Sequence, residues 1–523
     1  MLVLRSTRVV LPDGVRPASL YVSDGTITDV AGYDEAPGAP SAVAAPGIPP
    51  GRAESVYDVG DLIVSPGIVD THVHVNEPGR TEWEGFETAT RAAAAGGVTT
   101  IVDMPLNSIP ATTTVEAFEA KRSAARGRCH VDVAFWGGVV PGNASELEAL
   151  ADAGVRGFKC FLVPSGVDEF PPVGERDLRK AMPILARRGV PLLVHAESAD
   201  VINRCMVADR RIDRGADTRV RPYDSTHLDT EAGRDGPMCP PGRRGPMRPP
   251  GRGGPMCPAP GSNYSAYLAT RPPEAEVDAI RLMIRLAREF RTRVHIVHVA
   301  AEEAVDELAR AQNDGVAITA ETCPHYLSFA AEDIPDGATE FKCAPPVREA
   351  RHRDALWNAL ARGTLALVAT DHSPAPPALK CPGDFMRAWG GVASLELSLS
   401  ATWTGLAARP EHAPDRVDHL APAFVPRHEL SPLARLSTWM SAAPAALAQL
   451  HRKGRIAVGC DADLVIWDPD QTRIVDPLAL QQRHKLTPYA GRCLRGVVHA
   501  TFLRGQQVWD GGRLTCPASG HLL

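Results

Sequence analysis

Apolar and polar positions alternate in two different ways along this chain, and the difference divides it into three parts. Short runs typical of β-strands, separated by polar and Gly/Pro turns, occupy both ends of the chain. The two ends can therefore pair into one small β-sandwich domain, formed by residues 1–66 and 453–523. Its predicted strands are Leu2–Val10, Ser19–Val22, Thr26–Val30, Asp463–Trp467, Arg495–Leu503 and Gln507–Trp509.

The middle of the chain, residues 67–452, alternates apolar strand-like runs with helical segments such as Thr81–Ala95, Glu276–Phe290 and Ala301–Asn313. Strands joined by helical crossovers predict an α/β fold with parallel pairing, either a closed (β/α)8 TIM-type barrel or an open doubly wound sheet. We expect the barrel, because the candidate chemistry lies at strand ends. The predicted strands are Gly67–His74, Val98–Met104, Val131–Trp136, Val155–Leu162, Pro191–His195, Val294–Val299, Val316–Thr322 and Leu365–Asp371.

Two segments follow neither pattern. The stretch Asp34–Gly51 is rich in Ala, Pro and Gly, and Gly-Pro-Met recurs at positions 236, 245 and 254 within a Pro/Gly/Arg-rich insertion at about 232–261. Glycine does not fall at every third position there, which excludes a collagen helix. Without a periodic apolar face the insertion is expected to be disordered, as a tolerated surface insertion or an error in the predicted gene rather than a functional element.

Composition narrows the classes of partner. Charged residues make up 23% of the chain and the net charge is −6, so neither a nucleic-acid surface nor a polybasic membrane patch is expected. No apolar run is long enough to span a bilayer. The eleven cysteines are scattered and odd in number, which fits reduced thiols in an intracellular protein. We expect a cytoplasmic location; the ending Gly520-His-Leu-Leu is not the standard peroxisomal signal, but peroxisome and mitochondrion stay open.

The strongest chemical signal is Pro66-Gly-Ile-Val-Asp-Thr-His72-Val-His74. Side chains alternate along a strand, so His72 and His74 point the same way and can clamp one metal ion. A lone His-x-His pair is common by chance, so its meaning depends on partners from other strands.

Three further strands supply such partners: His195, His298 and Asp371 each stand at the end of an apolar run, with His295 expected to face away from His298. A carboxylate in that position is costly unless a metal or another charge meets it. Each residue alone could be an ordinary core or loop residue. Together they lie where catalytic groups of barrels collect.

Lys159 lies within the apolar run Gly157-Phe-Lys-Cys-Phe-Leu-Val. Its side chain could extend outward to solvent along a packed stem. Beside several histidines and an aspartate another role becomes plausible. Desolvation lowers the pKa of a lysine, and the neutral amine can then react with carbon dioxide to give a carbamate that bridges two cations.

These motifs resemble the cyclic amidohydrolase family, and within it the allantoinase group. The resemblance runs from about residue 2 to 515, apart from the two low-complexity segments. Its motifs are His72-Val-His-Val-Asn-Glu-Pro-Gly-Arg80 with Trp83-Glu-Gly, Met104-Pro-Leu-Asn107, Gly157-Phe-Lys-Cys-Phe161, Val194-His-Ala-Glu197, Glu321-Thr-Cys-Pro-His-Tyr326, Lys342-Cys-Ala-Pro-Pro-Val-Arg348, Asp371-His-Ser-Pro, Ala388-Trp-Gly-Gly391, and Lys453-Gly-Arg-Ile-Ala-Val-Gly459 with Asp461-Ala-Asp463.

The resemblance implies two zinc ions per subunit bridged by a carbamate on Lys159, and a homotetramer. One ion would take His72, His74 and Asp371 and the other His195 and His298, although other divalent ions suit such ligands. A hydroxide held between the ions would open the internal amide of the hydantoin ring of allantoin to give allantoate, with Asp371 moving the proton.

Finer differences bear on the substrate. Dihydroorotases typically carry an Arg two residues after the second His, where this chain has Asn76, and hydantoinases and dihydropyrimidinases carry a Tyr shortly after the lysine, where Phe161–Gly166 has none. Both absences favour allantoin over those alternatives. A non-catalytic scaffold related to hydantoinases is a further alternative, but a scaffold has no reason to keep the complete set of ligands.

Four residues are candidate substrate contacts. Asn107 could bind the ureido arm, although turn residues of this type are common. Cys323 and Ser373 lie on strand-end loops, where their backbone could meet ring atoms, and Gly391 begins a loop that could approach the ligand closely. Cys323 is not expected to act as a thiol nucleophile.

Overall fold

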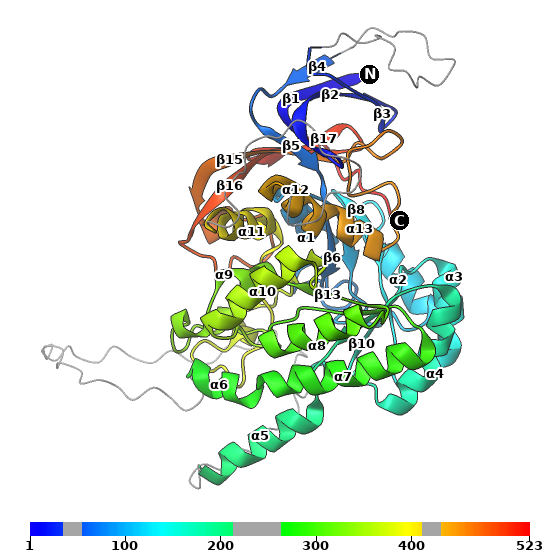
Figure 1. The fold of residues 1–523 in the computed structure, drawn as a ribbon, viewed down its shortest axis with the longest axis vertical. Coiled ribbons are helices and arrows are strands. Elements are labelled where there is room, and N and C mark those ends of the chain that lie inside the picture. The colour runs from blue at the N-terminus through cyan, green and yellow to red at the C-terminus, as the bar shows by residue number, and fades with distance from the viewer. Residues whose placement is uncertain (35–54, 213–262, 410–429) are drawn as a thin grey trace, which may run out of the picture.

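The computed structural model describes residues 1–34, 55–212, 263–409 and 430–523. Two segments singled out in the sequence lie outside the described residues. They are the Gly-Pro-Met insertion at 232–261 and the segment Asp34–Gly51, of which only Asp34 is described. The remainder forms a helix-covered barrel with a β domain beside it, in which the N-terminal and C-terminal strands lie together (Figure 1).

The barrel contains the eight strands expected from the sequence, all pairing in parallel. Their hydrogen bonds form two sheets, β6-β7-β8 and β9-β10-β11-β12-β13-β14. The short β9 directly continues β8 along the chain, so these two segments together make up one of the eight strands. The strands are β6 (Ile68–Val73), β7 (Val98–Asp103), β8 (Asp132–Phe135), β9 (Gly137–Gly138), β10 (Phe158–Phe161), β11 (Leu192–His195), β12 (Val294–Ile296), β13 (Ile318–Thr322) and β14 (Leu367–Val368).

Backbone hydrogen bonds between the first strand and the residues after the last one close this barrel. His74 N donates to His372 O at 2.8 Å, and His372 N donates to His72 O at 3.3 Å. At the other junction, Gly137 N donates to Gly157 O at 2.9 Å and connects β9 to the start of β10. The closed barrel is therefore confirmed, and the open sheet is excluded.

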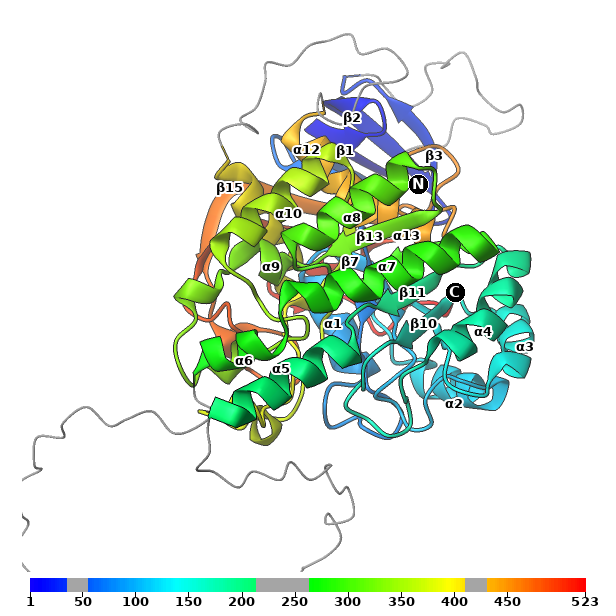
Figure 2. The ribbon, with the colours of Figure 1, turned by 60° about the horizontal axis from the view of Figure 1, so that its bottom comes forward.

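Helices cover the outside of the barrel, and α7 and α8 cross in front of the strands in Figure 2. Alternate strand residues, among them Val69, Val102 and Leu193, fill the barrel interior, while their neighbours face the helices. The helices are α1 (Phe86–Ala95), α2 (Val115–Ala125), α3 (Leu147–Ala153), α4 (Glu175–Arg188), α5 (Ala199–Ile212), α6 (Tyr264–Thr270), α7 (Pro273–Phe290), α8 (Glu302–Asn313), α9 (Pro324–Ser328), α10 (Ala350–Arg362), α11 (Ser398–Ala407), α12 (Pro432–Ser437) and α13 (Ala443–Leu447).

Two element boundaries differ from the prediction for identifiable reasons. The helix expected from Thr81 begins only at Phe86, because Gly85 has φ +99°, which a helix does not accommodate. The strand expected from Val155 begins at Phe158, after Gly157 with φ +154°. A Cβ at Gly157 would lie 2.7 Å from Pro191 O, so only glycine fits there.

The small domain is built from both ends of the chain, as expected. Its strands form one hydrogen-bonded sheet in the order β18-β17-β16-β15-β5-β1-β2-β3, with β4 beside β1. The sheet folds over itself into a sandwich, since Tyr57 of β4 packs edge-on against Phe502 of β16 at 5.8 Å. The strands are β1 (Leu2–Leu11), β2 (Gly14–Ser23), β3 (Thr26–Ala31), β4 (Ser55–Asp58), β5 (Ile63–Pro66), β15 (Leu464–Ile474), β16 (Cys493–Leu503), β17 (Gln506–Asp510) and β18 (Arg513–Leu514).

A buried ionic cluster joins this domain to the barrel. Lys453 Nζ lies 2.6 Å from carboxylate oxygens of both Asp132, on barrel strand β8, and Asp463. It also lies 2.9 Å from Asp461, and Arg504 contacts Asp132 at 2.5 Å. The three acidic side chains lie close enough to hold a metal ion, but Lys453 contacts all three, and Arg504 and Arg452 supply two further positive charges. The Lys453–Asp463 motif therefore has a structural role.

Sequence-based expectations on cysteines and membranes can also be compared with the described ranges. Nine of the eleven cysteines lie there, and each is a free thiol. Within the same ranges no helix is both long and apolar enough to cross a membrane.

Replacing Lys453 with Met is expected to lower the free energy of unfolding by about 3–5 kcal/mol, because buried carboxylates lose their cation. The neighbouring Arg452→Met is the control, since Arg452 is 60% exposed and contacts Asp461 from the surface. Its expected cost is about 0–1 kcal/mol. Urea denaturation followed by circular dichroism measures both, and equal losses for the two variants would contradict a structural role for the cluster.

Candidate metal centre

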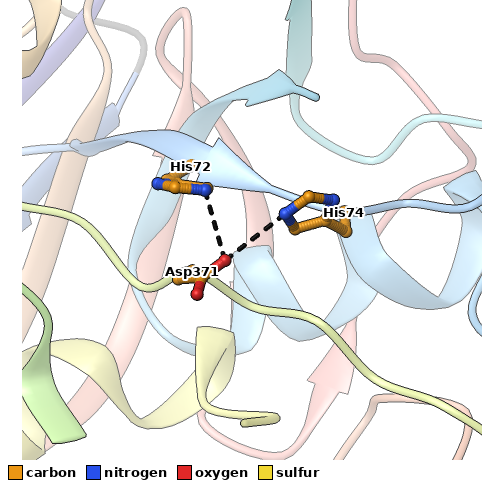
Figure 3. Close-up of side chains that lie close together, drawn as sticks. All are labelled: His72, His74 and Asp371. Atoms are coloured by element: carbon orange, nitrogen blue, oxygen red, sulfur yellow. Dashed lines mark ion pairs between the residues drawn. The ribbon is translucent and has the colours of Figure 1, made fainter. Parts of the chain in front are cut away.

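Three predicted ligands converge where β6 meets the end of the last strand. His72 is in β6 and His74 follows it, so both imidazoles face the same side. Their Nε2 atoms lie 3.2 and 3.3 Å from Asp371 Oδ1 (Figure 3). All three side chains are at least mostly buried, and their ligand atoms lie within 4.8 Å of one another. This spacing suits a single divalent ion.

His195 and His298 lie beside this group. The ring centroid of His298 is 5.4 Å from that of His72 and 4.5 Å from that of His195. Phe161 stacks on His195 with centroids 4.6 Å apart, which fixes the plane of that imidazole. The four histidines therefore form a continuous row of rings at the carboxyl end of the barrel strands. Such a row can hold two metal ions.

The backbone at two of these positions is unusual. His298 has φ +42° and Asp371 has φ +47°, in the left-handed region that side chains other than glycine rarely adopt. Each residue lies just after the strand that carries it, and the turn redirects its side chain. Strain of this kind persists where the surrounding structure enforces it, and it clusters at functional sites.

Lys159, in β10, is fully buried and its Nζ has no hydrogen-bond partner in the described part of the chain. The Nζ lies 5.0 Å from the centroid of Phe161. Burial is the main cause that lowers the pKa of Lys159 to about 8, against the partial opposition of Asp371 and Glu321. A buried amine with no partner, directed toward a row of histidines, fits a group that is completed by carboxylation and metal ions.

Three of the histidines, His72, His195 and His298, are held in the form that binds metals. Burial lowers the pKa of His72 and of His298 well below the usual value, and the charge of Lys159 adds to the effect at both. Burial also lowers the pKa of His195, although Glu197 opposes the shift. Neutral imidazole is the ligand form, so these rings are ready to donate a lone pair.

Two buried glutamates orient these rings, and the sequence analysis gave them no role. His72 Nδ1 donates to Glu321 Oε1 at 2.6 Å, and His295 Nε2 donates to the other oxygen at 3.1 Å. His195 Nε2 donates to Glu197 Oε2 at 2.7 Å. The opposite nitrogen of each ligand ring is thereby left for a metal. The sequence offered one signal for each of these roles: Glu197 lies two residues after His195, and Glu321 lies near the end of β13.

A cavity of about 80 Å³ lies against this centre and is lined by most of the predicted site residues. Lys159 and Cys323 are buried and are not among the lining residues. Leu106, Phe161, Ser165, Ala344, Trp389 and Gly390 also line the cavity and were not predicted. The predicted residues in the lining are His72, His74, Asn107, His195, His298, Asp371, Ser373 and Gly391.

The Glu321→Gln variant tests the orienting role of that glutamate. It removes the negative charge facing His72 without changing the size of the side chain, and the zinc dissociation constant is expected to rise about 10–100-fold. Glu119→Gln, at an exposed pair with Arg122, is the control and should bind zinc like the parent. Competition with a chromogenic chelator measures both. Unchanged zinc affinity in Glu321→Gln would contradict the role.

Comparisons with known proteins agree with this geometry. The amidohydrolase family matches residues 63–508. An allantoinase from Streptomyces avermitilis is 44% identical over 522 residues, covering 100% of this chain and 98% of the relative, and one from Arabidopsis thaliana is 37% identical over 536 residues, covering 99% and 90%. The solved L-hydantoinase (dihydropyrimidinase) from Arthrobacter aurescens has a TM-score of 0.80 and 28% identity, covering 100% of this chain and 99% of its own. The chain belongs to the amidohydrolase family, in its allantoinase group.

Proposed function

We propose that this metal-dependent cyclic amidohydrolase opens the hydantoin ring of allantoin at its internal amide and gives allantoate. The observation that carries the proposal is the convergence of four histidines, Asp371 and the buried Lys159 at one end of the barrel. The relatives named allantoinase support the substrate. A non-catalytic scaffold would have no use for this set of groups.

The residues present fit two divalent ions, and we propose zinc. His72, His74 and Asp371 would hold one, His195 and His298 the other, and a carboxylated Lys159 would bridge them. When bound, such a pair lowers the pKa of a water molecule and polarises the scissile carbonyl. Glu321 and Glu197 fix the rings of His72 and His195 before any metal arrives.

Lys159 must lose a proton before it can bridge. The neutral amine adds to carbon dioxide, one C–N bond forms, and a proton leaves, so the product is a carbamate with one negative charge. Lowering the pKa of Lys159 to about 8 favours this step. It raises the share of neutral amine at pH 7 by about a few hundredfold over an ordinary lysine. The carbamate also removes the cost of a buried cation.

Asp371 is placed to move the proton of the reaction. Its Oδ1 is shared between His72 and His74, and its side chain lines the cavity. We propose that it accepts a proton from the attacking water and returns it to the departing ring nitrogen. One carboxylate can perform both steps because the two proton transfers occur in sequence at the same place.

The cavity lining argues for a neutral substrate. Among the described residues that line it, none is a lysine or an arginine, so a substrate carboxylate such as that of dihydroorotate would find no counter-charge. Asn76, at the position where dihydroorotases carry an arginine, is buried and donates from Nδ2 to Pro374 O at 3.3 Å. The neutral ureido arm of allantoin needs no cation.

We propose Asn107, Ser373 and Gly391 as substrate contacts. All three line the cavity, and Asn107 Oδ1 is buried without a partner there. A Cβ at Gly391 would lie 2.3 Å from Ser373 O, so this wall requires glycine. Cys323 stays a proposal for a backbone contact, although its side chain is outside the cavity lining.

The proposal also covers the oligomeric state, the cellular location and the division into domains. A homotetramer rests on the family resemblance. An intracellular, cytoplasmic location is supported by nine free cysteines in the described ranges. The division into a barrel of residues 67–452 and a β domain of 1–66 and 453–523 is supported by the pairing of β5 with β15.

A substrate panel tests the function. Zinc-loaded protein is assayed with allantoin, dihydroorotate, dihydrouracil and hydantoin, with and without a chelator. Allantoin is expected to be hydrolysed fastest, and the chelator should abolish turnover. Fast turnover of dihydrouracil with none of allantoin would contradict the substrate, and chelator-resistant turnover would contradict the metal mechanism.

The Asp371→Asn variant separates proton transfer from metal binding. An amide still offers an oxygen ligand but cannot take up the proton, so the variant is expected to keep much of its zinc and to lose at least about 10²–10⁴-fold in kcat. Metal analysis and steady-state kinetics on one preparation measure both quantities. Turnover close to that of the parent, with full zinc, would exclude Asp371 from proton transfer.

A further inference from the structure

Some buried cations in this fold meet carboxylates and others, such as Lys342 and Lys380, meet backbone carbonyls, whereas the side chain of Arg156 meets neither within the described ranges. Lys121 lies 2.7 Å from Asp103, and Arg348 lies 2.6 Å from Glu276. Arg156, by contrast, has no hydrogen bond or ion pair from its side chain within the described ranges, and its Nε is buried. A partly buried charge without a partner is costly, which points to a partner from outside the chain.

The backbone holds Arg156 firmly in place. The residue directly precedes Gly157 and β10, and its N donates to Phe135 O of the neighbouring strand β8 at 2.9 Å. It therefore lies at the amino end of the strands, whereas the histidine row lies at their carboxyl end. Burial lowers the pKa of Arg156, and no neighbouring acid opposes the shift. A ligand held here would be separate from the catalytic cavity.

Arg156 lines a pocket of about 340 Å³ whose charged lining is entirely cationic. Arg187 and Arg188, from the last turn of α4, share the lining with Arg156, and no carboxylate is among the residues of the described chain that line it. Gln449, also in the lining, donates from Nε2 to Gly189 O at 3.2 Å.

The charges around the pocket do not balance. Arg187 lies 2.9 Å from Glu148 in an exposed pair, and Arg188 contacts Asp152. Two carboxylates therefore meet two of the three guanidinium groups, and the charge of Arg156 is left over. Exposed pairs of this kind contribute little, so Arg187 and Arg188 can turn toward an anion at small cost.

We propose that this pocket is a binding site for a small oxyanion, a carboxylate or a phosphate, held by the guanidinium of Arg156 with Arg187 and Arg188 at its sides. A guanidinium offers planar paired donors that match two oxygens of such a group. The site does not depend on the proposed reaction, since it lies at the opposite end of the barrel.

Calorimetric titration of the zinc-loaded protein tests the site. Inorganic phosphate and acetate are titrated separately, at constant ionic strength set with chloride, into the parent, Arg156→Gln and Arg310→Gln. Arg310 is 67% exposed and outside the pocket, so its variant makes the same charge change as a control. Any anion bound at the zinc ions contributes equally to all three proteins.

At least one of the two anions is expected to bind the parent and Arg310→Gln alike and to bind Arg156→Gln about tenfold more weakly or not at all. Which of the two anions shows that loss identifies the chemistry of the natural ligand. Equal binding of both anions in all three proteins would overturn the proposal, as would a melting temperature of the parent that neither saturating phosphate nor saturating acetate changes.

Two further measurements keep the test decisive. Arg188→Gln changes another residue of the lining and should also weaken binding, so it replaces Arg156→Gln if that variant does not fold. Light scattering on the anion-free proteins detects another occupant. A smaller assembly for Arg156→Gln than for the parent would mean that a carboxylate of a neighbouring subunit fills the pocket, and would overturn the proposal.

Discussion

Burial of basic groups is the constraint on which the rest of this site depends. Desolvation favours the neutral form of His72, His195 and His298, and burial lowers the pKa of Lys159 to about 8 while its amine has no hydrogen-bond partner in the described chain. The carboxyl end of the barrel strands thus carries several neutral imidazoles whose nitrogen lone pairs are free to bind a metal ion. Such an environment is unfavourable by itself and becomes favourable when divalent cations bind.

The barrel creates this environment by closing the chain on itself. The hydrogen bonds of His372 with His72 and His74 bring the end of the last strand beside the first, so that Asp371 meets two histidines distant in sequence. No described residue of the small domain lines the cavity. Its ionic cluster around Lys453 and Asp132 instead holds it against β8.

Much of this arrangement was predictable, because strand periodicity and strand ends are visible in a sequence. The eight barrel strands, the pairing of the two chain ends, and the five His and Asp residues at one rim followed from apolar runs ending in polar groups. Helix and strand starts near Gly85 and Gly157 were misplaced, since a positive φ depends on tertiary contacts. The roles of Glu321 and Glu197 were also missed, because a carboxylate that bonds a distant ring resembles any other buried acid in sequence. The left-handed backbone of His298 and Asp371 has no sequence signature either.

The central claim is that Lys159 and the histidine row together hold two metal ions. X-ray diffraction from crystals of the zinc-loaded protein, recorded at the zinc absorption edge, tests it directly. The account predicts two anomalous peaks about 3.5–4 Å apart, with continuous density from Lys159 Nζ to a planar group between them. A single peak, or density for Lys159 that ends at its amine, would contradict it.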